Sequence, residues 1–259
     1  MQSHPADQDA NESLRLSEQA YDTAIFHPRF RQFYGESDLY NFGFWHDADG
    51  QRIDHPGEAA RELVRRHIAQ DPNRARARRV LDVGCGLGAC TAQIASAYPQ
   101  ADVIGINYSS AQIDHASRLY AGPRISFQRM RAESIAFQDD TFDCIHAIET
   151  AMHFRTRQQF LEEARRLLRP GGRLILTDVL VDKPTSFVPH ENVLPTVGAY
   201  RSALEAAGLM PVTVEDIHAD TTLPFVRMLK RNAMAAYARG LERSIKAYVI
   251  AVAERPDES

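Results

Sequence analysis

The stretch RVLDVGCGLGAC, from Arg79 to Cys90, decides the fold of this chain. Its apolar run Val80–Val83 predicts a buried strand, and glycines follow directly at positions 84, 86 and 88. Glycine lets the backbone turn sharply and approach a ligand closely, and the amides at the start of the next helix suit a polar or anionic group. The stretch therefore predicts a strand, a ligand-binding loop and a helix in succession.

Strand-length apolar runs alternate with helical segments along the rest of the chain. This alternation predicts a doubly wound α/β fold, with a mostly parallel sheet covered by helices on both faces. The predicted strands are Val80–Val83, Val103–Ile106, Ile125–Gln128, Phe142–Ile148, Arg173–Leu180, Pro211–Ile217 and Tyr248–Ala253. The predicted helices are Leu14–Phe26, Pro56–Gln70 after a cap at Asp54, Ala89–Tyr98, Ser109 to Tyr120, Thr156 to Leu168, Val197–Ala207 and Pro224–Arg239. Ligands of such folds bind beyond the carboxyl ends of the strands.

Composition narrows the class of protein. The 259 residues suffice for one large domain, and 44% apolar with 25% charged residues is typical of a soluble globular protein. A net charge of −4 argues against a nucleic-acid partner. No apolar run is long enough to span a membrane, and the polar residues 1–12 resemble a disordered leader, not a signal peptide. We therefore expect a cytoplasmic protein, and the sequence leaves room for a homo-oligomer. The cysteines, Cys85, Cys90 and Cys144, are expected to be free thiols.

The glycine loop alone leaves two cofactors open. Gly84, Gly86 and Ala89 also satisfy the dinucleotide fingerprint G-x-G-x-x-G/A, which would make the chain an NAD-dependent oxidoreductase. Three features favour another cofactor. Asp82 stands two residues before the first glycine, where a carboxylate can meet a cationic ammonium group. The next strand ends in Asn107 instead of the acidic residue that an NAD ribose usually needs, and about 78 residues precede the loop.

Several motifs in order resemble one known family. LDVGCGLG resembles the first motif of the class I, seven-stranded S-adenosylmethionine-dependent methyltransferases. FQDDTFDCIHAIETAMHF (Phe137 to Phe154), EEARRLLRPGGRLILTD (Glu162 to Asp178) and AYRSALEAAGLMPVTVEDI (Ala199 to Ile217) resemble later regions of the same family. The resemblance covers about Arg79 to Ile217. It implies a seven-stranded sheet with an antiparallel last strand, S-adenosylmethionine as cofactor and S-adenosylhomocysteine as product.

The resemblance also implies a set of cofactor contacts. They fall on Asp82, Gly84, Cys85, Gly86, Asn107, Tyr108, Ala132, Glu133 and Ile148. The aspartate and the glycines would hold the methionine end, Asn107 the ribose hydroxyls, and the pair at 132 and 133 would flank the adenine. Two positions depart from the family: Asn107 replaces the usual Asp or Glu, and Arg131 stands where Asp is frequent.

An aromatic stretch precedes the glycine loop. YGESDLYNFGFW, from Tyr34 to Trp45, resembles a segment that forms a lid over the cofactor in small-molecule methyltransferases. A sulfonium cation is favoured against aromatic faces, so Tyr40 and Trp45 are the predicted lid contacts. We therefore expect an N-terminal helical and aromatic lid over residues 1–78. The cofactor-binding core would span residues 79–259, with a substrate insert near 181–198.

Candidates for the chemistry lie after the fourth and fifth predicted strands. His153 is the first candidate for a general base, because an unperturbed histidine titrates near neutral pH. Glu149 is the second, as a base or as a ligand of the cofactor amine. Asp178 is expected to point toward the cleft, and His190 in the insert is a weaker candidate. We see no convincing set of acidic metal ligands and predict no metal.

The sequence therefore predicts S-adenosylmethionine-dependent transfer of a methyl group to O, N or C of a small molecule, as in secondary metabolism. A methyltransferase-fold enzyme that uses the bound cofactor for other chemistry, such as cyclisation, is the main alternative. An NAD-dependent oxidoreductase and a methyltransferase of protein or RNA are further alternatives.

Overall fold

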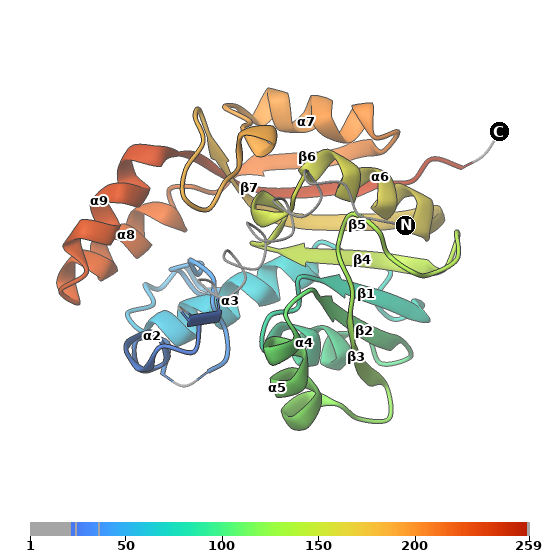
Figure 1. The fold of residues 1–259 in the computed structure, drawn as a ribbon, viewed down its shortest axis with the longest axis horizontal. Coiled ribbons are helices and arrows are strands. Elements are labelled where there is room, and N and C mark those ends of the chain that lie inside the picture. The colour runs from blue at the N-terminus through green and yellow to red at the C-terminus, as the bar shows by residue number, and fades with distance from the viewer. Residues whose placement is uncertain (1–21, 24, 36, 258–259) are drawn as a thin grey trace, which may run out of the picture.

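A computed structural model describes residues 22–23, 25–35 and 37–257, which form one seven-stranded sheet (Figure 1). The strand order is β3-β2-β1-β4-β5-β7-β6. The strands are β1 (Arg79–Val83), β2 (Asp102–Asn107), β3 (Ile125–Arg129), β4 (Phe142–Ile148), β5 (Leu168–Val181), β6 (Met210–Asp216) and β7 (Ile245–Glu254). Neighbouring strands from β3 to β5 are parallel, whereas β7 runs antiparallel to both β5 and β6. The predicted doubly wound sheet with an antiparallel last strand is confirmed.

Helices cover both faces of this sheet. They are α2 (Pro28–Phe33), α3 (Pro56–Ala69), α4 (Ala89–Ala97), α5 (Ser110–Tyr120), α6 (Arg157–Leu167), α7 (Val197–Ala206), α8 (Thr222–Arg231) and α9 (Ala235–Ser244), with short 3-10 turns η1 (Ala151–His153) and η2 (His190–Asn192). Successive residues of β1 point to opposite faces. Val80 joins the apolar cluster that includes residues of α3 and α4, while Leu81 joins the cluster that includes residues of α6 and α7.

Capping side chains begin several helices where the sequence predicts them, with one exception. The hydroxyls of Ser109 and Thr156 each accept the backbone N–H of the residue three positions later, at 3.2 Å. The predicted cap at Asp54 is wrong. The cap of α3 is His55, whose Nδ1 accepts the amide of Gly57 at 3.2 Å. Imidazole nitrogen here performs the role that a carboxylate oxygen more commonly fills.

The predicted helix Pro224–Arg239 is in fact two helices. Helix α8 ends at Arg231, and the side-chain amide of Asn232 donates to the Met228 carbonyl at 3.0 Å. Ala233 then takes a left-handed backbone conformation, with φ of 59°, and α9 starts at Ala235. Left-handed geometry is unfavourable for alanine, so nothing in the local sequence indicates this break.

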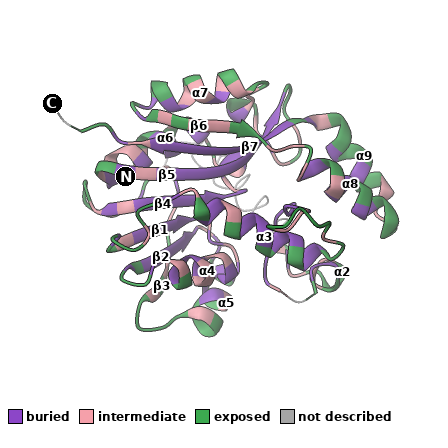
Figure 2. Cartoon of the chain, turned by 180° about the vertical axis from the view of Figure 1, so that it is seen from behind, coloured by how far each residue is buried: buried purple, intermediate pink, exposed green. Residues whose placement is uncertain are grey.

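Two segments distant in sequence lie beyond the same end of the sheet. In Figure 1 the N-terminal segment with α2 and α3 (blue) and the pair α8 and α9 (red) lie on the side to which the arrow of β4 points. Figure 2 shows the central strands largely buried, whereas β6 at the sheet edge is mostly intermediate or exposed. Among the described residues, no helix is both long enough and apolar enough to cross a membrane.

Two expectations fall largely outside the described residues. The predicted leader, residues 1–12, lies there entirely. So does most of the predicted helix Leu14–Phe26, of which Asp22, Thr23 and Ile25 are described and helical. The division at residue 78 stays a prediction, and one apolar cluster contains Phe33 and Trp45 together with Val80 and Tyr248.

Candidate functional site

The glycine loop follows β1 with three left-handed glycines, Gly84, Gly86 and Gly88, at φ of 77°, 53° and 95°. A Cβ at Gly84 would overlap the side chain of Thr150, so this position requires glycine for packing as well as for conformation. Next to Gly86, by contrast, the nearest atom to such a Cβ is Gln112 Oε1 at 3.9 Å. The space beside Gly86 is open, which fits the close approach of a ligand to the backbone.

Asp82 is a buried carboxylate in β1, directly before the loop. Its side chain is 1% exposed, and Oδ2 accepts the Thr91 hydroxyl at 2.6 Å. Among the described residues no basic side chain pairs with it, and burial raises the pKa of Asp82 to about 7. A buried carboxyl without a cationic partner fits the ammonium group of S-adenosylmethionine, which would favour its ionised form.

Asn107 ends β2 beside the loop, as predicted, and is already engaged in hydrogen bonds. Its amide donates to Gln112 Oε1 at 3.0 Å, and its Oδ1 accepts the Ser109 amide at 3.2 Å. The carboxylate of Asp22 also reaches this place, where it accepts from the Ser109 hydroxyl at 2.9 Å and the Gln112 amide at 2.6 Å. The N-terminal segment therefore contacts the polar cluster around Asn107.

The remaining predicted cofactor contacts surround the ends of β1 to β4. Cys85 and Ala132 are buried in the loop and after β3, and Ile148, which ends β4, is also buried. The backbone oxygen of Tyr108 accepts from Arg129 at 2.7 Å. Their contacts with a cofactor stay predictions.

Glu133, predicted to flank the adenine, is partly buried and already has two partners. Its Oε1 accepts the Arg155 amide at 2.6 Å, and Arg131 forms an ion pair with its other oxygen at 3.3 Å. The unusual Arg131 is therefore neutralised by its close neighbour. Glu133 therefore connects the segment after β3 to the segment after η1.

Glu149 follows β4 in a left-handed conformation, with φ of 53°. Its Oε2 accepts the amide of Phe42 at 2.8 Å and the hydroxyl of Tyr248 at 2.7 Å. Burial raises the pKa of Glu149 to about 8. These contacts attach the N-terminal segment to the end of β4, and the predicted catalytic role of Glu149 stays a prediction.

His153 closes the turn η1 after β4 and is held by the predicted substrate insert. Its Nδ1 lies 2.8 Å from the carbonyl oxygen of Phe187, and the two rings meet edge to face with centroids 6.1 Å apart. Because a carbonyl can only accept, the neutral ring carries its proton on Nδ1 and its lone pair on Nε2. Burial lowers the pKa of His153, which favours this neutral form.

Asp178, which is expected to point toward the cleft, has partners inside the protein, and its place at a cleft stays a prediction. It lies within β5, fully buried, and forms an ion pair with Arg157 at 2.7 Å, while Tyr200 donates its hydroxyl to it at 3.2 Å. Arg157 also donates to the Asn192 carbonyl at 2.6 Å, and the Asn192 amide donates to the Phe154 carbonyl at 2.7 Å. This network fastens the insert to the segment that carries His153.

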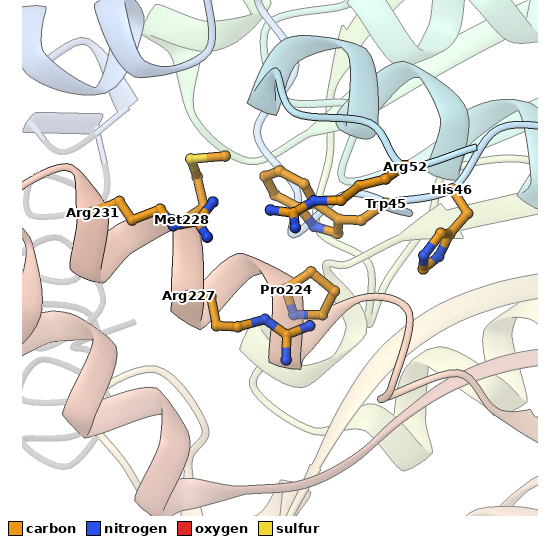
Figure 3. A pocket seen from close by; sticks show the side chains of 7 residues that line it. All are labelled: Trp45, His46, Arg52, Pro224, Arg227, Met228 and Arg231. Carbon is orange, nitrogen blue, oxygen red and sulfur yellow. The ribbon is translucent and has the colours of Figure 1, made fainter. Parts of the chain in front are cut away.

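The two predicted lid contacts have different surroundings. Tyr40 is half-buried and meets Tyr34 edge to face, with centroids 5.1 Å apart. Trp45 is buried, and its indole N–H donates to the Phe42 carbonyl at 2.8 Å. Trp45 lies in the wall of a pocket formed with α8 (Figure 3). His190, the weaker candidate, is exposed in η2.

Sequence reasoning missed the residues that support the site. Thr91, Thr150, Gln112 and Asn192 hold predicted site residues or the loops beside them. No local pattern marks these polar side chains, because their roles depend on which residues the fold brings beside them. Within the described residues, no three His, Cys, Asp or Glu side chains are grouped so as to hold a metal ion.

Comparisons with known proteins agree with this geometry. Residues 80–172 match a family model described as a methyltransferase domain. The chain is 31% identical over 215 residues to 27-O-demethylrifamycin SV methyltransferase of Amycolatopsis mediterranei, covering 77% of this chain and 76% of the relative. It is 30% identical over 187 residues to O-methyltransferase cnsE of Penicillium expansum, covering 68% and 66%. The matches span 53% to 66% of the length of the first three curated relatives.

A solved structure shares the fold at low sequence identity. The [4+2]-cyclase SpnF superposes with a TM-score of 0.74 at 21% identity, over 93% of this chain and 97% of that protein. At this identity the likeness concerns the fold alone.

Proposed function

Because the chain belongs to the class I S-adenosylmethionine-dependent methyltransferases, we propose that it transfers a methyl group to a hydroxyl oxygen of a small molecule. The observation that carries this proposal is the contact between His153 Nδ1 and the Phe187 carbonyl, at 2.8 Å. It fixes the tautomer in which Nε2 can accept a proton. The choice of oxygen among O, N and C is supported by relatives named as O-methyltransferases, and their names also favour a secondary metabolite.

The residues at the carboxyl ends of the strands are suited to hold the cofactor. S-adenosylmethionine, when bound, supplies an electrophilic methyl group attached to a sulfonium. Asp82 would bind its ammonium group, the open backbone at Gly86 would admit its methionine end, and Asn107 would meet its ribose. A buried carboxylate opposite an ammonium is a strong, oriented contact because little water screens it.

His153 would act as the base. Nε2 would take the proton of the substrate hydroxyl, so that the oxygen would keep an electron pair for its new bond to the methyl carbon. The bond of that carbon to sulfur would break, and its electron pair would stay on the sulfur of the product S-adenosylhomocysteine. The Phe187 carbonyl holds the ring, and the Arg157–Asp178 pair fastens the insert beside it. The same burial that lowers the pKa of His153 keeps it neutral before the reaction. Such positioning accounts for much of the catalysis of a displacement between two bound reactants.

The aromatic stretch is proposed as the lid. Its Phe42 amide binds Glu149 at the end of β4, and the Phe42 ring stacks on Phe225 of α8 with centroids 4.6 Å apart. A cover at this place would exclude water from the reacting groups.

The insert between β5 and α7 is proposed to select the substrate. The cytoplasmic location, the homo-oligomer and the absence of a nucleic-acid partner stay predictions of the sequence.

The experiment is a methyl-transfer assay on a panel of phenols and alcohols that includes 27-O-demethylrifamycin SV. We expect a product heavier by one methylene and formed in equal amount with S-adenosylhomocysteine. His153→Ala should lower kcat about 100-fold or more while the affinity for S-adenosylhomocysteine stays unchanged. The exposed His190→Ala is the matched control. Equal turnover of both variants would refute the role of His153, and an isomerised product without methylation would favour the cyclisation alternative.

A further inference from the structure

A small pocket lies between the N-terminal segment and α8, and none of the residues assigned to the reaction lines it except Trp45. Its volume is about 180 Å³. Figure 3 shows the side chains that line it. Its lining consists of Trp45, His46, Arg52, Pro224, Arg227, Met228 and Arg231. Three arginines in seven lining residues, with no carboxylate among them, make the pocket strongly cationic.

The positive charge is only partly balanced by carboxylates of the chain. Arg52 pairs with Asp54 at 3.0 Å and His46 with Asp220 at 3.1 Å, and all four side chains are substantially exposed. Surface pairs of this kind are weak and readily exchanged for another anion.

Arg227 and Arg231 have no ion pair within the described residues. They stand four apart on one face of α8, where two like charges repel each other and destabilise the helix slightly. An anion between them would remove that repulsion.

The other lining residues are apolar. Trp45 is 3% exposed and Met228 9% exposed, and Pro224 completes this side of the pocket (Figure 3). The indole N–H already donates to the Phe42 carbonyl, so the tryptophan offers apolar surface and not a further donor. Guanidinium groups next to apolar surface suit a ligand with an anionic head and an organic body.

We propose that this pocket binds the phosphate group of a small phosphate monoester, with Arg227, Arg231 and Arg52 around the phosphate and Trp45 against the organic part. A phosphate matches the fork of guanidinium donors, and its double charge gains more from three cations than a carboxylate does. This pocket shares Trp45 with the proposed lid, but binding of a phosphate there does not depend on the reaction proposed above. Its occupant would join α8 to the segment that binds Glu149.

Trp45 is the single tryptophan of the chain, so its fluorescence reports on this pocket directly. The full-length protein is titrated with inorganic phosphate and with phenyl phosphate at constant ionic strength, followed by fluorescence and by calorimetry. We expect saturable binding of both, tighter for phenyl phosphate because its ring contacts the apolar side. Arg227→Gln and Arg231→Gln should each weaken binding about tenfold or more. Arg239→Gln on α9, which removes an equal charge elsewhere, should leave it unchanged.

Two results would overturn the proposal. One is the absence of saturable heat and fluorescence change with either probe. The other is an equal loss of affinity in Arg239→Gln and Arg231→Gln, which would indicate diffuse attraction to net charge. Tighter binding of inorganic phosphate than of phenyl phosphate would refute the organic part of the assignment.

Arg227 and Arg231 are exposed and make no ion pair in the described chain, so their variants are expected to fold normally.

Discussion

The backbone amide of Phe42 donates a 2.8 Å hydrogen bond to Glu149, 107 residues away. The same carboxylate oxygen accepts the hydroxyl of Tyr248 at 2.7 Å. One buried side chain therefore connects the N-terminal segment, the end of β4 and the antiparallel strand β7. This contact attaches the N-terminal segment at the carboxyl end of β4.

Removing this acceptor should destabilise the fold. Glu149→Ala leaves a buried amide and a buried hydroxyl without their acceptor, so we expect a loss of about 1–3 kcal/mol in the free energy of unfolding. Glu149→Gln keeps an accepting oxygen and should lose much less. Urea unfolding of both variants measures the difference. Equal losses would contradict the claim that these two hydrogen bonds stabilise the fold.

A chain of buried polar groups makes stability depend on pH. His67 Nε2 lies 3.1 Å from His146 Nδ1, and His146 Nε2 lies 2.9 Å from the hydroxyl of Tyr98. Burial lowers the pKa of His67 well below its usual value and that of His146 to about 3. Below about pH 6.5 the unfolded chain therefore binds protons that the folded chain does not.

On their own, these two histidines make stability fall as pH drops from about 6.5 toward 5, by up to about 1.4 kcal/mol per pH unit each. Asp82 and Glu149 act in the opposite direction, because burial raises their pKa values to about 7 and about 8 and the folded chain then binds their protons. The effect of a histidine therefore shows in the difference between its variant and the unaltered protein at each pH. The slope of the unfolding free energy against pH should change in His67→Gln by the contribution of one histidine. The exposed His190→Gln should leave this slope unchanged. The free energy of unfolding in urea, measured at several pH values, gives the slope. An equal slope in His67→Gln and His190→Gln would contradict the assignment of a neutral, buried His67.

The sequence predicts the sheet well because its strands carry their signal locally. Val80–Val83 and Phe142–Ile148 are mainly apolar stretches of strand length, and the glycines after β1 indicate a loop without reference to the rest of the chain. The helix break at Ala233 carries no such signal, because alanine is an ordinary helix former. The true partners of Asp178 could not be predicted either. A buried ion pair depends on which of many arginines the fold brings near, and here it is Arg157, 21 residues earlier.

Two glycines share the same left-handed backbone conformation, so their alanine variants separate the energetic cost of steric overlap from the cost of backbone strain. Gly84 and Gly50 have φ of 77° and 76°, but a Cβ at Gly84 would overlap Thr150, whereas nothing lies within 4 Å of one at Gly50. Gly50→Ala should therefore cost only the left-handed conformation, about 1–2 kcal/mol. Gly84→Ala should cost about 1–3 kcal/mol more, from overpacking. Urea unfolding compares the two, and equal losses would mean that Thr150 moves aside freely.

Cofactor affinity should depend on pH through Asp82. Burial raises the pKa of Asp82 to about 7, and an ammonium ligand needs the ionised form. The affinity for S-adenosylhomocysteine should therefore fall as pH drops below about 7, by up to tenfold per unit, until the pKa of the bound state is reached. Asp82→Asn should bind more weakly and lose this dependence, which also controls for titration of the ligand. Parallel pH profiles of the two proteins would exclude Asp82 as the proton-linked group.

The most direct test of the account is a calorimetric titration of the protein with S-adenosylhomocysteine and with NAD at pH 8, where Asp82 is mostly ionised. The account predicts saturable binding of S-adenosylhomocysteine and no heat of binding with NAD. Asp82→Asn should weaken the binding about tenfold or more. Binding of NAD with no binding of S-adenosylhomocysteine would contradict the assignment of the glycine loop and of the whole site built around it.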